Sequence, residues 1–222
     1  MIDHKLGKYL EPTPLSDSDN SFLKSKARRI VTDSDSAKES ASKLFYFVRD
    51  HIVYGSSDLY AKASHALKRG VGNCKVKANV QMCLLRAVGI PARLHAASVK
   101  TKALKGLYPD WILAKIPQEF IHVWCECHLS GTWIACDATF DEPLFNALQR
   151  KGHLSEQAIP TIDWDGETDL RLLNLWQVKD VALFVSYDQI VQKGDLPPKL
   201  VSKLFGWIMS APINWHLARM RM

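Results

Sequence analysis

The strongest constraint in the sequence is Cys74, which follows a glycine and an asparagine and precedes a run of apolar residues at helical spacing. Apolar residues recur every three or four positions along residues 75–88, which predicts a helix with one apolar face. Asn73 is a favourable N-cap, and Gly89 followed by Pro91 ends the helix. A thiol in the first turn lies at the positive end of the helix dipole, which favours the thiolate. Cys74 is therefore the candidate nucleophile.

A second stretch predicts a β-hairpin. Two runs that alternate between apolar and polar residues lie on either side of Ser130-Gly131, a pair suited to a tight turn. In a two-residue turn, Leu129 pairs with Thr132 across the hairpin. This register puts His122 and Asp137 on the same face of the sheet, diagonal to each other. We therefore expect Asp137 to accept a hydrogen bond from His122, which leaves the second ring nitrogen for the candidate nucleophile.

Cys74, His122 and Asp137 together form a candidate catalytic triad. A thiol nucleophile needs a base to take its proton and a third group to orient that base, and the chain supplies these residue types in this order. Taken singly, each residue has an ordinary structural interpretation as a buried thiol, a sheet histidine or a turn former at a strand end. The ordered set favours catalysis.

Four segments of the chain resemble, in order, the successive motifs of the transglutaminase-like superfamily, whose members are relatives of papain. They are residues 72–74 (GNC), 84–93 (LLRAVGIPAR), 122–124 (HVW) and 133–139 (WIACDAT). The resemblance implies an α+β fold with a papain-like or transglutaminase-like core, in which the cysteine-bearing helix packs on an antiparallel sheet.

The same resemblance implies a role for each site residue. Cys74 would be the nucleophile, His122 the base and acid, and Asp137 the group that orients the imidazole. Backbone N–H groups at the start of the cysteine helix would hold the oxyanion, and Tyr54 matches the aromatic second donor.

The chain also departs from the family pattern. Ala138 follows Asp137 where the family often has proline, and Lys75 follows Cys74 where animal transglutaminases carry tryptophan. The flanking β-domains of animal transglutaminases have no counterpart in 222 residues, which weakens the inference of calcium control and protein cross-linking.

Length and composition predict a single domain. Of the 222 residues, 47% are hydrophobic and 23% charged, which is ordinary globular composition. We expect one transglutaminase-like domain over residues 1–222, with a core at about residues 36–140 and a C-terminal extension at about residues 141–222.

Other elements are predicted from local patterns. Ser36 begins a capping-box pattern and a helix that reaches about Ile52, whereas the stretch up to Gly70 is predicted to be irregular. A strand is expected over residues 92–99, followed by a long connection. In the extension, residues 181–185 suggest a buried strand or helix segment, and residues 200–215 an apolar stretch packed on the core rather than lying on a membrane.

Several classes of protein are excluded. The N-terminus has no apolar signal core, and residues 204–215 are too short to span a bilayer and contain Gly206 and Pro212, so no integral membrane segment is expected. The net charge of +6 is spread along the chain without a nucleic-acid motif, so no nucleic-acid partner is expected. Five cysteines, an odd number, suggest reduced thiols and a cytoplasmic protein.

No metal or cofactor is expected. Cys125, Cys127 and Cys136, with His128 nearby, offer a zinc alternative, but strand alternation directs the three thiols into the core and the imidazole away from them. The acidic residues 163–169 offer a calcium alternative, but they lack the ligand order of an EF-hand loop.

The sequence thus predicts a cysteine-dependent enzyme that attacks an amide of a peptide or protein, forms a thioester and passes the acyl group to water. Two alternatives stay open: transfer to an amine, as in true transglutaminases, and a non-catalytic binding module that keeps the fold. Lys75, a cation next to Cys74, favours hydrolysis because it repels a protonated amine donor. No motif indicates an oligomeric state.

Overall fold

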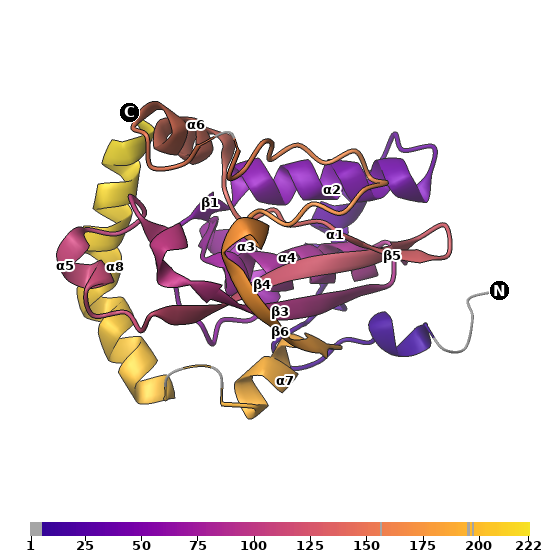
Figure 1. Cartoon of the computed structure of the whole chain (residues 1–222). Helices are drawn as coiled ribbons and strands as arrows, with labels where there is room; N and C mark the ends of the chain where they lie inside the picture. Colours follow the sequence, from indigo (N-terminus) through magenta and orange to yellow (C-terminus); the bar gives the residue numbers. More distant parts are fainter. Residues whose placement is uncertain (1–5, 156, 195, 197) are drawn as a thin grey trace.

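A four-stranded antiparallel sheet in the order β5-β4-β3-β6 is the frame on which the helices pack (Figure 1). The computed structural model describes residues 6–155, 157–194, 196 and 198–222, and the side chains at 201 and 203–207 lie outside this description. The strands are β3 (Ala92–Lys100), β4 (Glu119–Leu129), β5 (Thr132–Ala135) and β6 (Gln177–Phe184). The predicted α+β fold, with the cysteine-bearing helix packed on an antiparallel sheet, is confirmed.

Helix α4 (Cys74–Ala87) packs against β3 and β4 and is in turn covered by three helices. These are α1 (Ser21–Ile30), α2 (Ala37–His51) and α3 (Ala63–Arg69), and a short parallel pair, β1 (Val53–Tyr54) with β2 (Val71–Gly72), leads into α4. The remaining elements are η1 (Gly7–Tyr9), η2 (Thr101–Leu104), α5 (Asp110–Leu113), α6 (Glu142–Arg150), η3 (Asn174–Trp176), α7 (Tyr187–Gln192) and α8 (Lys199–Arg221).

Local capping explains where two of these helices begin. The Asn73 side chain accepts a hydrogen bond from the Val76 N–H at 3.2 Å, so α4 starts at Cys74 as predicted. Ser36 caps α2 by accepting from the Glu39 N–H at 3.1 Å. The Glu39 carboxylate accepts from the Asp35 N–H instead of from Ser36, so only half of the predicted capping box forms.

The hairpin register is as predicted. Ser130 and Gly131 have φ angles of 50° and 87°, the positive values that a tight two-residue hairpin turn requires. Leu129 pairs with Thr132, and the Cys136 N–H donates to the Cys125 carbonyl at 2.9 Å, which extends the same register toward Asp137.

Helix α4 differs from its prediction because it has almost no solvent-facing side. Its polar residues Lys77, Asn79 and Arg86 are all buried. Each reaches a backbone carbonyl from another part of the chain: Lys77 Nζ donates to the Arg49 carbonyl at 3.0 Å, and Asn79 Nδ2 to that of Leu15 at 3.0 Å. Arg86 donates to the Ala92 and Glu11 carbonyls at 2.8 and 2.7 Å. Helix α4 is therefore buried on nearly all sides and is not an amphipathic surface helix.

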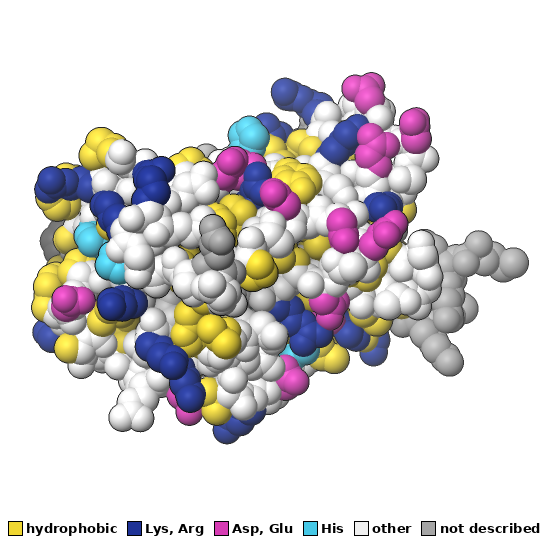
Figure 2. Space-filling view, turned by 45° about the horizontal axis from the view of Figure 1, so that its top comes forward, with side chains coloured by type: hydrophobic (Ala, Val, Ile, Leu, Met, Phe, Trp, Pro, Cys, Tyr) yellow, Lys and Arg dark blue, Asp and Glu magenta, His cyan; other side chains and the backbone are white. Residues whose placement is uncertain are grey.

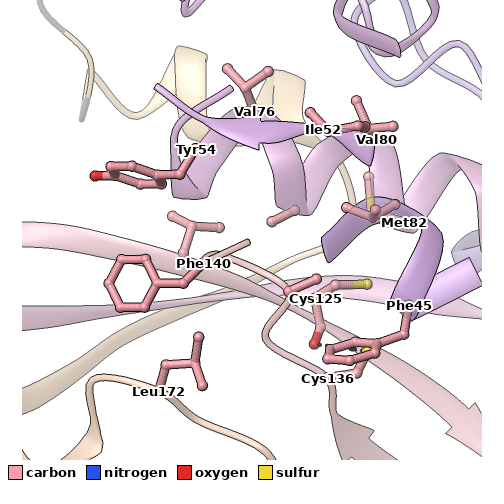
Figure 3. Packing of buried hydrophobic residues seen from close by; sticks show 14 of the residues in the cluster. Phe45, Ile52, Tyr54, Val76, Val80, Met82, Cys125, Cys136, Phe140 and Leu172 are labelled. Carbon is pink, nitrogen blue, oxygen red and sulfur yellow. Dashed lines mark hydrogen bonds between the residues drawn. The ribbon is translucent and has the colours of Figure 1, made fainter. Parts of the chain in front are cut away.

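The apolar core fills the space between α2, α4 and the sheet. Figure 3 shows Phe45, Val80, Met82, Cys125 and Cys136 converging there, and all five side chains are fully buried. Such a core stabilises the sheet through roughly 25 cal/mol for each Å² of apolar surface removed from water. It thereby fixes β4 relative to α4, the two elements that carry the candidate triad's cysteine and histidine.

Two predictions about secondary structure are wrong. The stretch before Gly70, predicted to be irregular, contains α3, a helix of seven residues whose N-cap residue, Lys62, makes no side-chain cap. Residues 181–185 contribute to β6, but this strand lies at the edge of the sheet and Leu183 is 51% exposed, so it is not buried.

The C-terminal extension ends in α8, a continuous helix that passes through both Gly206 and Pro212. Pro212 is exposed, so the carbonyl that loses its helical partner can bond to water. Within residues 200–215, Ile213 is buried against the protein as expected, but Leu200, Ile208 and Trp215 are exposed, so this stretch packs on the core only in part. Leu217 and Met220, beyond that stretch, are also buried. Within the described residues, no helix combines the length and the apolar character needed to cross a membrane.

Arg221 and Asp141 fasten the end of α8 to the core. The Asp141 carboxylate is 1% exposed on its side chain, and Arg221 donates to it from Nε at 2.8 Å and from Nη2 at 2.6 Å. Asp141 also accepts from the Tyr54 N–H at 2.8 Å, and Arg221 donates to the Tyr54 carbonyl at 2.8 Å. Both peptide groups of Tyr54 are thus held by this ion pair.

Replacing Arg221 by alanine is expected to lower the free energy of unfolding by about 3 kcal/mol, because it leaves a buried carboxylate without its cation. Urea unfolding followed by circular dichroism measures this. Arg219→Ala, an exposed position on the same helix, is the matched control and should change stability by no more than about 0.5 kcal/mol. Equal losses in the two variants would contradict the role of the Arg221–Asp141 pair.

Candidate active site

Cys74 is the first residue of α4 and is 6% exposed. Its side chain adjoins His122 from β4 and lies within the electrostatic influence of Lys75, whose Nζ is fixed by a hydrogen bond to the Ile121 carbonyl at 2.6 Å. The N–H of Cys74 is among the donors that a helix start leaves without an intrahelical partner. The thiol and a free backbone donor therefore occupy the same end of α4.

His122 and Asp137 form a buried hydrogen bond of 2.8 Å between Nε2 and Oδ2. Asp137 is oriented by two further bonds, from the Thr139 N–H to Oδ1 at 3.1 Å and from the Leu172 N–H to Oδ2 at 3.2 Å. Since Nε2 bonds to the carboxylate, the other ring nitrogen, Nδ1, is left for Cys74. This is the arrangement that the hairpin register predicted.

The three groups shift one another's pKa values. Burial raises the pKa of Cys74, but the interaction with His122 and the charge of Lys75 outweigh it, and the pKa falls from 9.0 to about 7. Burial lowers the pKa of His122, but the charge and hydrogen bond of Asp137 and then the contact with Cys74 raise it from 6.5 to about 10. Between these values the pair is a thiolate beside an imidazolium.

Tyr54, the predicted oxyanion donor, lies close enough to Cys74 for the two side chains to interact electrostatically. Tyr54 is 4% exposed. Burial raises the pKa of its hydroxyl well above the ordinary value, and Tyr108 and Cys74 raise it further. The hydroxyl therefore stays protonated and is able to donate a hydrogen bond. The Tyr54 ring packs edge-on against Phe140 at a centroid distance of 5.6 Å, a contact visible in Figure 3.

Tyr108 is a residue of this site that the sequence did not single out. It lies in the connection between β3 and β4, and its hydroxyl is 3.4 Å from the Tyr54 hydroxyl. After burial, the charge of Cys74 also contributes to raising the pKa of Tyr108. Proline and aspartate around it predict a turn but not a contact with the thiol, and no local signal would have placed it here.

The same face of β4 carries a polar network beside His122. Trp124 stacks on His95 with ring centroids 4.3 Å apart, and His95 bonds to Glu126 at 2.7 Å and to Asp180 at 2.9 Å. The Trp124 ring is also 5.8 Å from that of His122, so it buttresses the imidazole.

The three hairpin cysteines are buried free thiols, and the described residues contain no group of three or more histidine, cysteine or acidic side chains arranged to hold a metal ion. Asp165, in the acidic segment, accepts hydrogen bonds from the N–H groups of Glu167 and Thr168, both at 2.8 Å. This segment is thus a turn in which the Asp165 side chain accepts hydrogen bonds from the following backbone N–H groups.

Comparison with known proteins places these residues in a family. The sequence profile of the transglutaminase-like superfamily matches residues 24–138, more than half of the chain. The chain belongs to the transglutaminase-like superfamily. The match includes Cys74, His122 and Asp137, and it ends before the extension that supplies Leu172 and Arg221.

A solved structure of similar fold accompanies this family match. A candidate cysteine protease from Cytophaga hutchinsonii is 23% identical, with a TM-score of 0.51, over 65% of this chain and 45% of that one. A candidate protease from Parabacteroides distasonis is 14% identical, with a TM-score of 0.39, over 60% of this chain and 25% of that one. This chain therefore spans less than half the length of either protein. No curated protein matches it in sequence.

Cys74 is expected to react with iodoacetamide before Cys83, Cys125, Cys127 and Cys136, all of which are 0% exposed. Its alkylation rate should rise through pH 7, because its pKa is about 7 rather than 9.0. Mass mapping after brief treatment across a pH series measures both. In His122→Gln, the rise should move toward the pH of an ordinary thiol; an unchanged profile, or earlier labelling of another cysteine, contradicts the assignment of an activated thiolate.

Tyr108→Ala is expected to accelerate alkylation of Cys74 by a bulky maleimide more than by iodoacetamide, because it removes a ring whose hydroxyl lies 3.4 Å from that of Tyr54 in the same site. The ratio of the two rates, measured under the same conditions, reports access rather than thiolate fraction. Tyr60→Ala, a tyrosine in the loop before α3, is the control and should leave the ratio unchanged. Equal acceleration of both reagents would indicate a general loosening of the site instead.

Proposed function

We propose that this protein is a cysteine-dependent hydrolase that cleaves an amide of a peptide or protein through a thioester. The observation that carries the proposal is the buried His122–Asp137 hydrogen bond, which leaves the second imidazole nitrogen facing a thiol at a helix start. Thiol, imidazole and carboxylate in this order are the parts needed to generate a nucleophile, orient its base and protonate a leaving group.

In the acylation step, the Cys74 thiolate attacks the carbonyl carbon, and a C–S bond forms as the carbonyl π electrons move to oxygen. The His122 imidazolium then donates its proton to the amine nitrogen as the C–N bond breaks. The products are a thioester on Cys74, a neutral imidazole and a free amine. Asp137 keeps the ring oriented through both proton states and stabilises the imidazolium.

In the deacylation step, the neutral His122 takes a proton from water while the water oxygen attacks the thioester carbon. The tetrahedral intermediate collapses, the C–S bond breaks, and a carboxylic acid leaves as the thiolate–imidazolium pair is restored. No proton is gained or lost by the enzyme over the full cycle, apart from ionisation of the product acid.

The oxyanion formed in both steps has two candidate donors in this proposal. One is the backbone N–H at Cys74, at the positive end of the α4 dipole. The other is the Tyr54 hydroxyl, which is kept protonated by its raised pKa. The Arg221–Asp141 pair holds the Tyr54 backbone on both sides, so the donor is positioned by the C-terminal helix.

Water is the proposed acceptor because Lys75 lies beside the nucleophile. Its ammonium group is fixed on the Ile121 carbonyl, and its charge lowers the pKa of Cys74, so it acts at close range. This cation would repel a protonated amine donor that approaches the thioester, whereas it would not repel a neutral water molecule. All five cysteines are free thiols, which supports a reducing compartment such as the cytoplasm.

Cleavage of a pooled peptide library, followed by mass spectrometry, tests the proposal. Cys74→Ser and His122→Ala should abolish cleavage, and Tyr54→Phe should lower kcat about 100-fold with little change in KM, as loss of one oxyanion donor does. Cys83→Ser is the matched control and should retain activity. Cleavage that persists in Cys74→Ser contradicts the proposal, and an alkylatable Cys74 without any cleavage would favour a binding module.

Partition of the acyl-enzyme separates hydrolysis from transfer. With a cleaved peptide and rising concentrations of a primary amine, the acid should stay the main product, and Lys75→Ala should increase the share of amide. The ratio of acid to amide is read by mass spectrometry. Dominant amide formation by the wild-type protein at millimolar amine would support a transglutaminase instead.

A further inference from the structure

Helix α8 turns apolar side chains toward solvent. From residue 208 to the C-cap residue, the exposed apolar residues are Ile208, Ala211, Pro212, Trp215, Ala218 and Met222. At about 100° per residue these positions fall on one side of the helix. Trp215 is 62% and Ile208 52% exposed, values that are high for large apolar side chains. The outward face of α8, defined by these six residues, is thus a continuous apolar stripe.

Polar contacts on the inner side fix this orientation. Asn214 accepts from the Ser56 N–H at 2.8 Å and donates to the Ser56 carbonyl at 3.0 Å, and Ser210 bonds to the Ser56 hydroxyl at 3.0 Å. A Cβ at Gly55 would lie 2.6 Å from Asn214 Oδ1, so only glycine permits this close approach. Directional bonds therefore hold the helix with its apolar stripe outward.

The segment that carries the stripe is basic, although Arg221 is paired with Asp141 on the inner side of the helix. The sequence from 199 to 222 contains Lys199, Lys203, Arg219 and Arg221 and no acidic residue. Arg219 is exposed and lies over the Trp215 ring at 4.8 Å. The combination of exposed tryptophan and arginine on an apolar helix face is typical of helices that lie in a membrane interface.

The connection that carries α5 adds to the same edge of the molecule. His216 of α8 bonds to the Gly106 carbonyl at 3.2 Å, and Figure 1 shows α5 beside α8. Trp111 of α5 is 55% exposed, with the Lys115 ammonium 5.9 Å from its ring. Figure 2 shows hydrophobic and basic side chains intermixed along this edge, where Asp110 is the acidic neighbour of the tryptophan.

We propose that the outward face of α8 docks on an anionic phospholipid surface. The apolar stripe supplies the side chains that enter the lipid interface, and the positive charges of Arg219 and Lys115 attract the negative headgroups. A second copy of the chain fits this face less well, because pairing two such faces brings like charges together. A helix of 23 residues lies along such a surface over about 34 Å.

Sedimentation of the full chain with lipid vesicles tests the proposal. Vesicles of phosphatidylcholine mixed with phosphatidylglycerol should bind the protein and shift tryptophan emission to shorter wavelength, whereas phosphatidylcholine alone should bind it weakly. Ile208→Gln combined with Trp215→Gln should weaken binding about tenfold or more. Arg219→Gln should weaken it about fivefold at low salt.

Leu175→Gln combined with Leu183→Gln is the matched control, because these leucines are 63% and 51% exposed on other elements. This variant should bind like the wild type, and circular dichroism checks that all variants are folded. Equal binding to neutral vesicles, or an equal loss in the control, overturns the proposal. Failure to bind anionic vesicles overturns it too, and self-association that the Ile208/Trp215 variant abolishes would then assign the face to a second copy.

Discussion

The hydrogen bond between His122 and Asp137 is the interaction on which the candidate site depends. Both side chains are almost fully buried, and a carboxylate in such a place is costly unless charge and hydrogen bonds compensate it. Here the imidazole and the N–H groups of Thr139 and Leu172 do so. The bond exists only in one strand register, because a slip of one residue would turn Asp137 to the other face of the sheet. The Ser130-Gly131 turn therefore determines the site from the far end of the hairpin.

Local patterns were sufficient to predict this part of the structure. A tight turn sets the pairing of the strands that it joins, and alternation along each strand then decides which side chains share a face. The start of α4 is equally local, because Asn73 bonds to the backbone three residues later. The positions of Cys74, His122 and Asp137 could thus be predicted from short stretches of sequence, together with the antiparallel character of the sheet.

Contacts between distant segments could not be predicted in this way. The polar residues of α4 gave it the pattern of an amphipathic helix, yet Lys77 and Asn79 are buried because Arg49 and Leu15 offer them carbonyl groups. Those partners come from other helices and loops, and no spacing in the sequence indicates them. The same holds for Tyr108 beside the Tyr54 hydroxyl and for Arg221, which binds the Tyr54 carbonyl. Tertiary partners, rather than propensity, decided each of these positions.

The dependence of Tyr54 on Arg221 has a consequence for the newly made protein. Cys74, His122 and Asp137 emerge from the ribosome well before Arg221, which lies at the end of α8. A nascent chain can therefore hold the thiol, its base and its carboxylate while Tyr54 still lacks the cation that fixes its carbonyl. Chemistry that requires a fixed oxyanion donor would begin only after the last helix has docked. In the proposed mechanism, Cys74 would thus lack a positioned Tyr54 donor until α8 has been made and has docked.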